Sequence, residues 1–182
     1  LDAKFVALFS GGMMEQFCKN KNIKSYKIKE EHSPRASFVG FLYSALNILE
    51  QIVPVKKTDV SESIQSLFNI QRIVSSKNLS KTNEALQIAE WIKEIPMVYY
   101  PSGLQSAAIR FKNSMQENAK VHVITEDVIE ACHNGIVAWD KPKNVQPILI
   151  QGKDDYVKTK ERWEIIKELF HENGIQYKEI FS

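Results

Sequence analysis

The chain has 182 residues, with 24 basic and 22 acidic side chains and a formal net charge of +2. This length allows one large or two small domains with a buried core, and the near balance of charge argues against nucleic-acid binding. Two cysteines outside any metal-binding spacing argue against a disulfide framework or a zinc site. The sequence has no long apolar run that would predict a membrane span and no signal-peptide pattern that would predict secretion. With the two isolated cysteines, we expect a reduced, cytoplasmic setting.

The first segment predicts a strand, a glycine turn and a helix. The apolar run 5–9 reads as a strand, and residues 13–20 read as the helix. Between them stand Ser10, Gly11 and Gly12. Such a turn at the carboxyl end of a strand can hold an anion on its N–H groups, although a tight turn needs glycine for steric reasons alone. Residues 24–29 alternate in polarity and predict a strand near a sheet edge.

The clearest helix start follows this strand. Ser33 as N-cap and Pro34 at the first helical position begin a helix that runs to about residue 49. That helix is apolar enough all round to be largely buried. Arg35 stands at its N-terminus, where the helix dipole disfavours a cation. Its guanidinium could bind an anionic sugar phosphate or stabilise an enediolate, or pair with the glutamates at 30–31.

The middle of the chain is more polar and predicts a helical connector, residues 55–94. A turn leads into a helix over 61–74, for which Ser61 is a candidate cap. The segment 75–80 is a break, and helical periodicity resumes over 83–92. We expect the charges of this connector to form a solvated face.

The stretch 95–139 carries the densest chemistry of the chain. Residues 95–100 form an apolar run that predicts a buried strand, and apolar residues then recur at three- and four-residue steps over 104–115. This change of period predicts a strand that turns directly into an amphipathic helix. Ser102 suits the N-cap of that helix, and Gly103 lies beside it.

Two candidate proton-transfer groups follow. Glu117 lies where the helix ends, and His133 comes after a predicted strand over 121–125 and an acidic turn. A carboxylate and an imidazole are the side chains most readily tuned to move protons near neutral pH. Taken singly, Glu117 is more typical of a solvated helix-end acid, His133 of a turn, and Lys120 of a cation that favours a helix C-terminus.

The last segment again alternates strand and helix. Residues 145–151 predict a strand in which Pro147 argues for a bulge or a place away from the centre of the sheet. Residues 152–155 open a helix that Gly174 ends, and 175–180 predict the next strand. Strands that alternate with helices predict a three-layer, flavodoxin-like α/β fold with parallel sheets flanked by helices.

Four segments, in this order, carry a family resemblance: SGGMMEQFCKNKNI, SPRASFVGFLYSALNILE, GLQSAAIRFKNSMQENAK and ACHNGIVAW. They resemble the bifunctional phosphoglucose/phosphomannose isomerases, which are built from sugar-isomerase (SIS) domains. The resemblance implies that residues 1–54 are the C-terminal part of a first SIS domain and that 95–182 are a second SIS domain lacking its C-terminal end. The family's phosphate loop and catalytic lysine have no match, so we expect an internal piece of a longer protein or a reduced relative.

The resemblance also implies a function. It predicts an isomerase that interconverts glucose 6-phosphate, with mannose 6-phosphate as a further substrate, and fructose 6-phosphate through an enediolate, without a metal or a cofactor. Glu117 would be the base, His133 the ring-opening acid or base supplied by the neighbouring subunit of a homodimer with a shared active site, and Arg35 the electrostatic stabiliser. The residues predicted to contact the substrate are Ser10, Gly11, Gly12, Pro34, Ser102, Gly103, Asn118, Lys120 and Asn134.

Two other classes of function stay open. A non-catalytic sugar-phosphate-binding module would keep the fold and bind hexose phosphates without turning them over. A structural or dimerisation fragment would keep the core and do neither. Turnover and binding assays together separate these classes from the enzyme.

Overall fold

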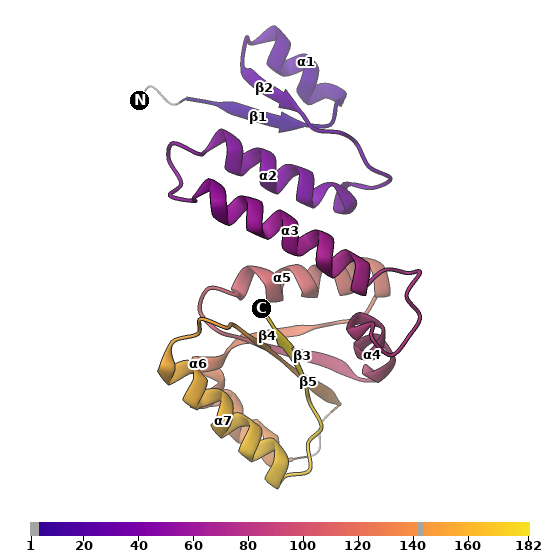
Figure 1. Cartoon of the computed structure of the whole chain (residues 1–182), viewed down its shortest axis with the longest axis vertical. Coiled ribbons are helices and arrows are strands. Elements are labelled where there is room, and N and C mark those ends of the chain that lie inside the picture. The colour runs from indigo at the N-terminus through magenta and orange to yellow at the C-terminus, as the bar shows by residue number, and fades with distance from the viewer. Residues whose placement is uncertain (1–3, 142–143) are drawn as a thin grey trace. The chain divides into compact units, whose positions relative to one another are not determined.

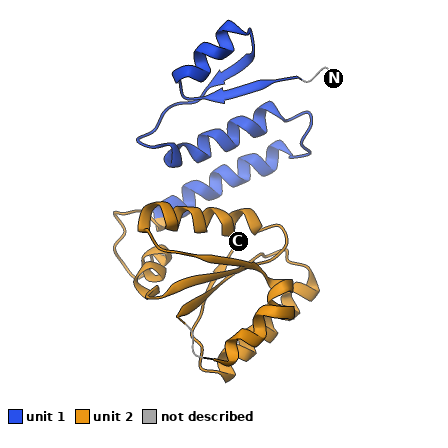
Figure 2. Ribbon diagram, turned by 180° about the vertical axis from the view of Figure 1, so that it is seen from behind, with its two compact units in different colours: residues 1–72 blue, residues 73–182 orange. Residues whose placement is uncertain are grey.

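The computed structural model describes residues 4–141 and 144–182 (Figure 1). The chain divides into two compact units, one up to residue 72 and the other from residue 73 onward (Figure 2). Each unit combines parallel strands with helices, which confirms the predicted α/β class. No helix in the described part of the chain has the length and apolar character needed to cross a membrane.

From residue 4 onward, unit 1 contains a parallel strand pair and three α-helices. In chain order they are β1 (Val6–Phe9), α1 (Gly12–Asn20), β2 (Lys24–Lys27), the 3-10 turn η1 (Pro34–Ser37), α2 (Phe38–Ile48) and α3 (Lys57–Ile73). The strands pair with Val6 opposite Lys24. α3 begins four residues before the predicted start, so Ser61 is not its cap. The Ser61 hydroxyl instead donates a hydrogen bond to the Lys57 carbonyl inside the helix, at 3.0 Å.

The start and the burial of α2 differ from the prediction. Ser33 precedes the turn η1, but its hydroxyl makes no capping bond. No residue of α2 is buried, and Phe38, Val39 and Leu42 are 43, 45 and 40% exposed. The described sheet of unit 1 has only two strands, so it offers too little surface to cover a helix that is apolar all round.

Unit 2 contains a four-stranded parallel sheet in the order β4-β3-β5-β6. Its elements are α4 (Glu84–Trp91), β3 (Ile95–Tyr100), α5 (Gln105–Ser114), η2 (Met115–Ala119), β4 (Ile124–Asp127), α6 (Val128–Glu130), η3 (Ala131–Gly135), η4 (Ile136–Asp140), β5 (Val145–Gln151), α7 (Val157–Glu172) and β6 (Lys178–Phe181). The segments η2 and η3 are π-helical, and η4 is a 3-10 helix. Gly174 has a φ of 65°, which confirms it as the stop after α7.

The core of unit 2 lies on both faces of this sheet. Val98 and Ile148 point to the face covered by α4 and α5, where they pack with Ala108. Their neighbours Tyr99 and Leu149 point to the other face, beneath α6 and α7 (Figure 1). Because both faces are covered, the central strands β3 and β5 read as nearly continuous apolar runs, and the unit has the predicted three layers.

Pro147 lies in the central strand β5, contrary to its predicted place. The N–H of Ile95 donates to the carbonyl of Asn144, so alternate residues of β5 direct their backbone groups toward β3. By this alternation the nitrogen of Pro147 faces away from β3, toward the side of β6. β6 pairs with β5 only from Ile148 onward. The missing N–H therefore falls where β5 has no partner on that side, and the strand needs no bulge.

Candidate functional site

The candidate residues of unit 2 lie on its two π-helical segments. η2 continues α5 and carries Glu117 and Asn118, and η3 continues α6 and carries His133 and Asn134. All four residues are exposed. π-helical turns are rare and occur frequently at functional sites. The apolar periodicity of the sequence did not reveal them, because each segment is a single turn of five residues, too short to show a period of its own.

The two segments flank the same strand along the chain. η2 leads into β4 and η3 follows it, and among the described residues β4 pairs only with β3, so it is an edge strand. α5 packs on one face of the sheet and α6 on the other. Glu117 and His133 therefore belong to segments that border one sheet edge from its two faces.

Local hydrogen bonds hold the end of η2. The Asn118 amide donates to the Ser114 carbonyl at 2.8 Å, and the Lys120 ammonium donates to the Glu117 carbonyl at 2.7 Å. Lys120 has a left-handed backbone with φ of 58°, which ends the helix. This geometry matches the interpretation of Lys120 as a helix-terminal cation, and its contact with substrate stays a prediction.

The stretch that carries His133 is anchored at both ends. At its start the Asp127 carboxylate accepts a 2.7 Å bond from the N–H of Ile129 and caps α6. At its far end the indole N–H of Trp139 donates to the Tyr99 hydroxyl at 3.0 Å. Both Tyr99 and Trp139 belong to the buried core, so the peptide between these anchors has limited freedom.

A partly buried acidic residue lies beneath this stretch, and the sequence interpretation missed it. Glu126 pairs in register with Tyr99, and its Oε2 is buried with no hydrogen-bond partner in the described part of the chain. Burial, and then the charge of Glu130, raise the pKa of Glu126. Burial likewise raises the pKa of Tyr99 to about 12. Asn134 donates to Glu130 at 3.4 Å, so the acids and η3 adjoin.

The signal for Glu126 in the sequence is weak. The predicted strand ends at residue 125, so Glu126 falls in the predicted acidic turn. A glutamate in such a turn is indistinguishable from any surface acid. β4 begins at Ile124 instead, three residues later than the predicted strand, and this shift places Glu126 within the sheet.

Ser102 and Gly103 lie at the carboxyl end of β3, but Ser102 is not the N-cap. α5 starts at Gln105 with Leu104 in the cap position and no side-chain cap bond. A turn intervenes, in which the N–H of Leu104 donates to the Pro101 carbonyl and Gly103 has a φ of 96°. This turn delays the helix and leaves Ser102 exposed at the edge where ligands bind in α/β sheets.

The candidates of unit 1 lie in the loops after its two parallel strands. Ser10, Gly11 and Gly12 follow β1, and Pro34 and Arg35 lie in η1, which the loop after β2 reaches. Carboxyl ends of parallel strands meet at one edge, so the fold brings these two loops to the same edge. The φ of Gly12 is 73°, a conformation that favours glycine, so the turn has a steric need for it.

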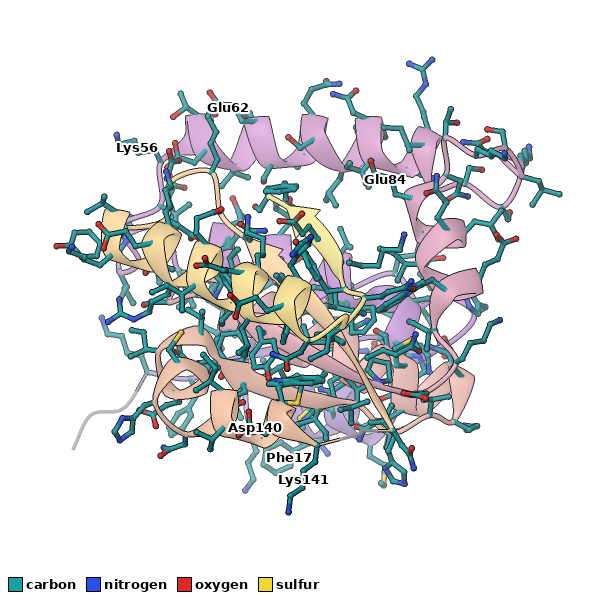
Figure 3. All side chains as sticks on the ribbon, turned by 90° about the horizontal axis from the view of Figure 1, so that it is seen from below. Phe17, Lys56, Glu62, Glu84, Asp140 and Lys141 are labelled. Atoms are coloured by element: carbon teal, nitrogen blue, oxygen red, sulfur yellow. The ribbon has the colours of Figure 1, made fainter. Side chains whose placement is uncertain are left out.

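A hollow of about 480 Å³ lies in unit 2 away from these candidates. Lys93, Gln146, Asp140 and Lys141 help to line it, and the last two project from the outside of the molecule (Figure 3). It adjoins the starts of β3 and β5, the opposite edge from the one where such sheets bind ligands, so we assign it no role. Within residues 4–141 and 144–182, no group of three or more His, Cys, Asp or Glu side chains is placed to hold a metal ion.

Comparison with known proteins gives relatives of one kind. The bifunctional phosphoglucose/phosphomannose isomerase of Caldicellulosiruptor bescii is 24% identical over 179 residues, which cover 92% of this chain and 52% of that protein. The enzyme of the same name from Pyrobaculum calidifontis is 24% identical over 141 residues, covering 75% of this chain and 40% of that protein. The chain thus spans about half the length of the curated relatives it matches, or less.

A solved structure and a family model complete the comparison. The C-terminal domain of glucosamine-fructose-6-phosphate aminotransferase from Francisella tularensis aligns with a TM-score of 0.55 at 16% identity, over 97% of this chain and 58% of that one. This likeness supports the fold alone. The family model for the bacterial phospho-glucose isomerase C-terminal SIS domain matches residues 81–182. Because that match spans more than half of the chain, the protein belongs to the bacterial phospho-glucose isomerase C-terminal SIS domain family.

Proposed function

We propose that the protein takes part in aldose–ketose isomerisation, interconverting glucose 6-phosphate, and also mannose 6-phosphate, with fructose 6-phosphate. One observation carries the proposal. In a chain of this family, Glu117 and His133 each stand exposed on a π-helical segment at edge strand β4. The pattern supplies a carboxylate and an imidazole, the two groups that the reaction needs for proton transfer.

In the proposed reaction the sugar ring opens before the proton moves. His133 assists by giving a proton to the ring oxygen, while the C1 hydroxyl gives its proton to a solvent water and the bond between C1 and the ring oxygen breaks. Glu117 then removes the proton from C2 of the open aldose, which leaves an enediolate with its negative charge on O1. The hydroxyl proton on O2 passes to O1 through solvent water, and Glu117 returns its proton to C1 as C2 becomes the carbonyl carbon. Arg35 places its positive charge over the enediolate oxygens, where electrostatic stabilisation lowers the barrier.

Contacts with a sugar phosphate are proposed in each unit taken by itself. The residues proposed to make them are Ser10, Gly11, Gly12 and Pro34 of unit 1, and Ser102, Gly103, Asn118, Lys120 and Asn134 of unit 2. Asn118 already bonds a backbone carbonyl at the end of α5 and Lys120 one in η2, so they would exchange those bonds for substrate oxygens. We further propose that residues 1–54 belong to a first SIS domain, that 55–94 connect, and that 95–182 belong to a second.

We also propose a homodimer in which His133 acts in the neighbouring subunit's site. Its support is the exposure of His133 and the unpaired side of edge strand β4 in the described sheet. Cys18 and Cys132 are both free thiols, and this agrees with a reduced cytoplasmic compartment.

The test is turnover of fructose 6-phosphate by the parent chain, by Glu117→Gln and by Glu161→Gln. Glu161 is an exposed α7 residue whose partner is Lys158 at 2.7 Å, so it controls for loss of a surface carboxylate. We expect Glu117→Gln to lower kcat by about 10²–10⁴-fold, the usual share of a general base, while substrate binding by calorimetry persists. If the parent binds fructose 6-phosphate without turning it over, the enzyme hypothesis is wrong and a binding module takes its place. If the parent neither binds nor turns over the sugar phosphate, a structural role is left.

A further inference from the structure

Glu126 has no part in the proposed proton transfers, yet its carboxyl lies against the segment that carries His133. A Cβ added at Gly135 would lie 2.7 Å from Oε2 of Glu126 and 3.3 Å from both Cδ and Oε1. Real Cβ atoms essentially never come within 3.0 Å of such a neighbour, so Oε2 occupies space that a side chain at Gly135 would need, and the two 3.3 Å contacts would be tight. The carboxyl therefore packs on the backbone at the end of η3.

The direction of the Glu126 side chain follows from the sheet. Residues paired in parallel register point to the same face, so Glu126 shares the face of its partner Tyr99. That face is covered by the helical stretch from α6 to η4 and by α7, and it holds the bond between Tyr99 and Trp139. Glu126 thus lies under the peptide between the anchors at Asp127 and Trp139.

We propose that Glu126 is a positioning residue, whose carboxyl seated on Gly135 fixes where η3 holds His133 and Asn134 at the edge of the sheet. The inference rests on the proposed function of His133. Gly135 is the last residue of η3 and lies two positions after His133, so a shift at this contact moves the imidazole directly. The absence of a Cβ at Gly135 is what allows the contact.

The protonation state of Glu126 affects this contact. Tyr99 on β3 and Glu130 on α6 interact electrostatically with the Glu126 carboxyl. On the elements that cover it, Cys132 of η3 acts on Tyr99, and Arg162 of α7 acts on the Cys132 thiol. Burial first, and then the Glu130 charge, raise the pKa of Glu126, so the neutral acid is favoured more in the folded protein than in the unfolded chain. The stabilisation this gives is complete below the ordinary glutamate pKa and is lost as pH rises through the raised value. Ionisation places an unpaired charge under η3 and weakens the packing of the carboxyl against Gly135.

The first experiment needs no enzymatic activity. Nuclear magnetic resonance follows the Gly135 amide and the His133 imidazole against pH, in the parent chain and in Glu126→Gln, which keeps the shape of the acid. We expect the Gly135 amide of the parent to shift with a midpoint above that of an ordinary glutamate, and Glu126→Gln to lack that step. A Gly135 amide that titrates identically in both proteins would overturn the proposal.

The second experiment uses the contact itself. In Gly135→Ala the new methyl group collides with the carboxyl, and in the double variant Glu126→Ala with Gly135→Ala it has room. We expect Gly135→Ala to displace the His133 resonances and to lower kcat by about 10²-fold at little change in KM, as a misplaced catalytic group does. The double variant should restore both the resonances and most of kcat.

The outcomes separate the two proposals. If Gly135→Ala changes neither the His133 resonances nor kcat, the carboxyl merely swings aside and the positioning role is wrong. If the parent lacks isomerase activity but the resonances shift and recover as stated, the proposed function fails while the positioning of η3 by Glu126 stands.

Discussion

Removal of one hydroxyl group from the core should measure how firmly the His133 stretch is anchored. Tyr99 is 1% exposed and Trp139 8%, and the indole N–H of Trp139 donates to the Tyr99 hydroxyl at 3.0 Å. Tyr99→Phe keeps the ring but leaves that N–H unpaired where water has little access. An unsatisfied buried donor costs about 1–3 kcal/mol, and we expect Tyr99→Phe to lower the free energy of unfolding by this amount.

Urea unfolding followed by tryptophan fluorescence is the appropriate assay. All three tryptophans of the chain lie in unit 2: Trp91, Trp139 and Trp163. The signal therefore reports on the unit that contains the substitution. In thermal unfolding the same loss should lower Tm by about 2–4 °C for each kcal/mol, as is usual for a chain of this size.

Tyr100→Phe is the matched control for this prediction. Tyr100 follows Tyr99 on β3 but points to the opposite face, and its hydroxyl receives a weaker 3.4 Å bond from Gln105. Gln105 is exposed, so its amide can bond water instead, and we expect a loss below about 0.5 kcal/mol. Equal losses in the two variants would refute the reasoning that the buried bond to Trp139 anchors the stretch.

Two further predictions concern the termini of helices and the titration of the core. Asn83 is 5% exposed and caps α4: its side chain accepts a bond from the N–H of Leu86 at 3.1 Å and donates one to the Asn78 carbonyl. In the urea assay, Asn83→Ala should lower the free energy of unfolding by about 1–2 kcal/mol. An unchanged unfolding midpoint would contradict the cap. Burial raises the pKa of Tyr99 to about 12, so an ultraviolet titration should show one phenol that ionises at high pH and that is missing in Tyr99→Phe. Because the pKa is raised in the folded protein, the free energy of unfolding should fall as pH rises through that value. A Tyr99→Phe curve that keeps the late step would contradict this assignment.

The sequence predicts best where one physical signal decides the structure. The run 95–100 is apolar at every position but two tyrosine hydroxyls, because both faces of β3 are covered, and the strand has the predicted bounds. Gly174 ends α7 because few other residues accept its positive φ. Such signals are local, so no knowledge of the rest of the fold is needed.

Predictions that depend on tertiary neighbours fare worse. Pro147 is tolerated in a central strand only because β6 starts one residue further along, and the exposure of α2 follows from the small described sheet of unit 1. Ser102 and Ser61 carry a correct preference for caps, but the helices start elsewhere. The contact between Glu126 and Gly135 joins strand β4 to the π-helical segment η3. The apolar periodicity of the sequence predicts neither the pairing register of β4 nor the single wider turn of η3.

The central claim is that Glu117 moves a proton of a sugar phosphate, and isotope exchange tests it most directly. The chain is incubated with fructose 6-phosphate in D₂O, and C2 of the glucose 6-phosphate formed is examined for deuterium. The proton held on Glu117 can exchange with D₂O before it is returned, so we expect deuterium at C2 with the parent and with Glu161→Gln. We expect almost no labelled product with Glu117→Gln, although that variant still binds the ketose. A Glu117→Gln protein that labels C2 as fast as the parent would contradict the role of Glu117, and a parent that binds fructose 6-phosphate without forming product would contradict the isomerase itself.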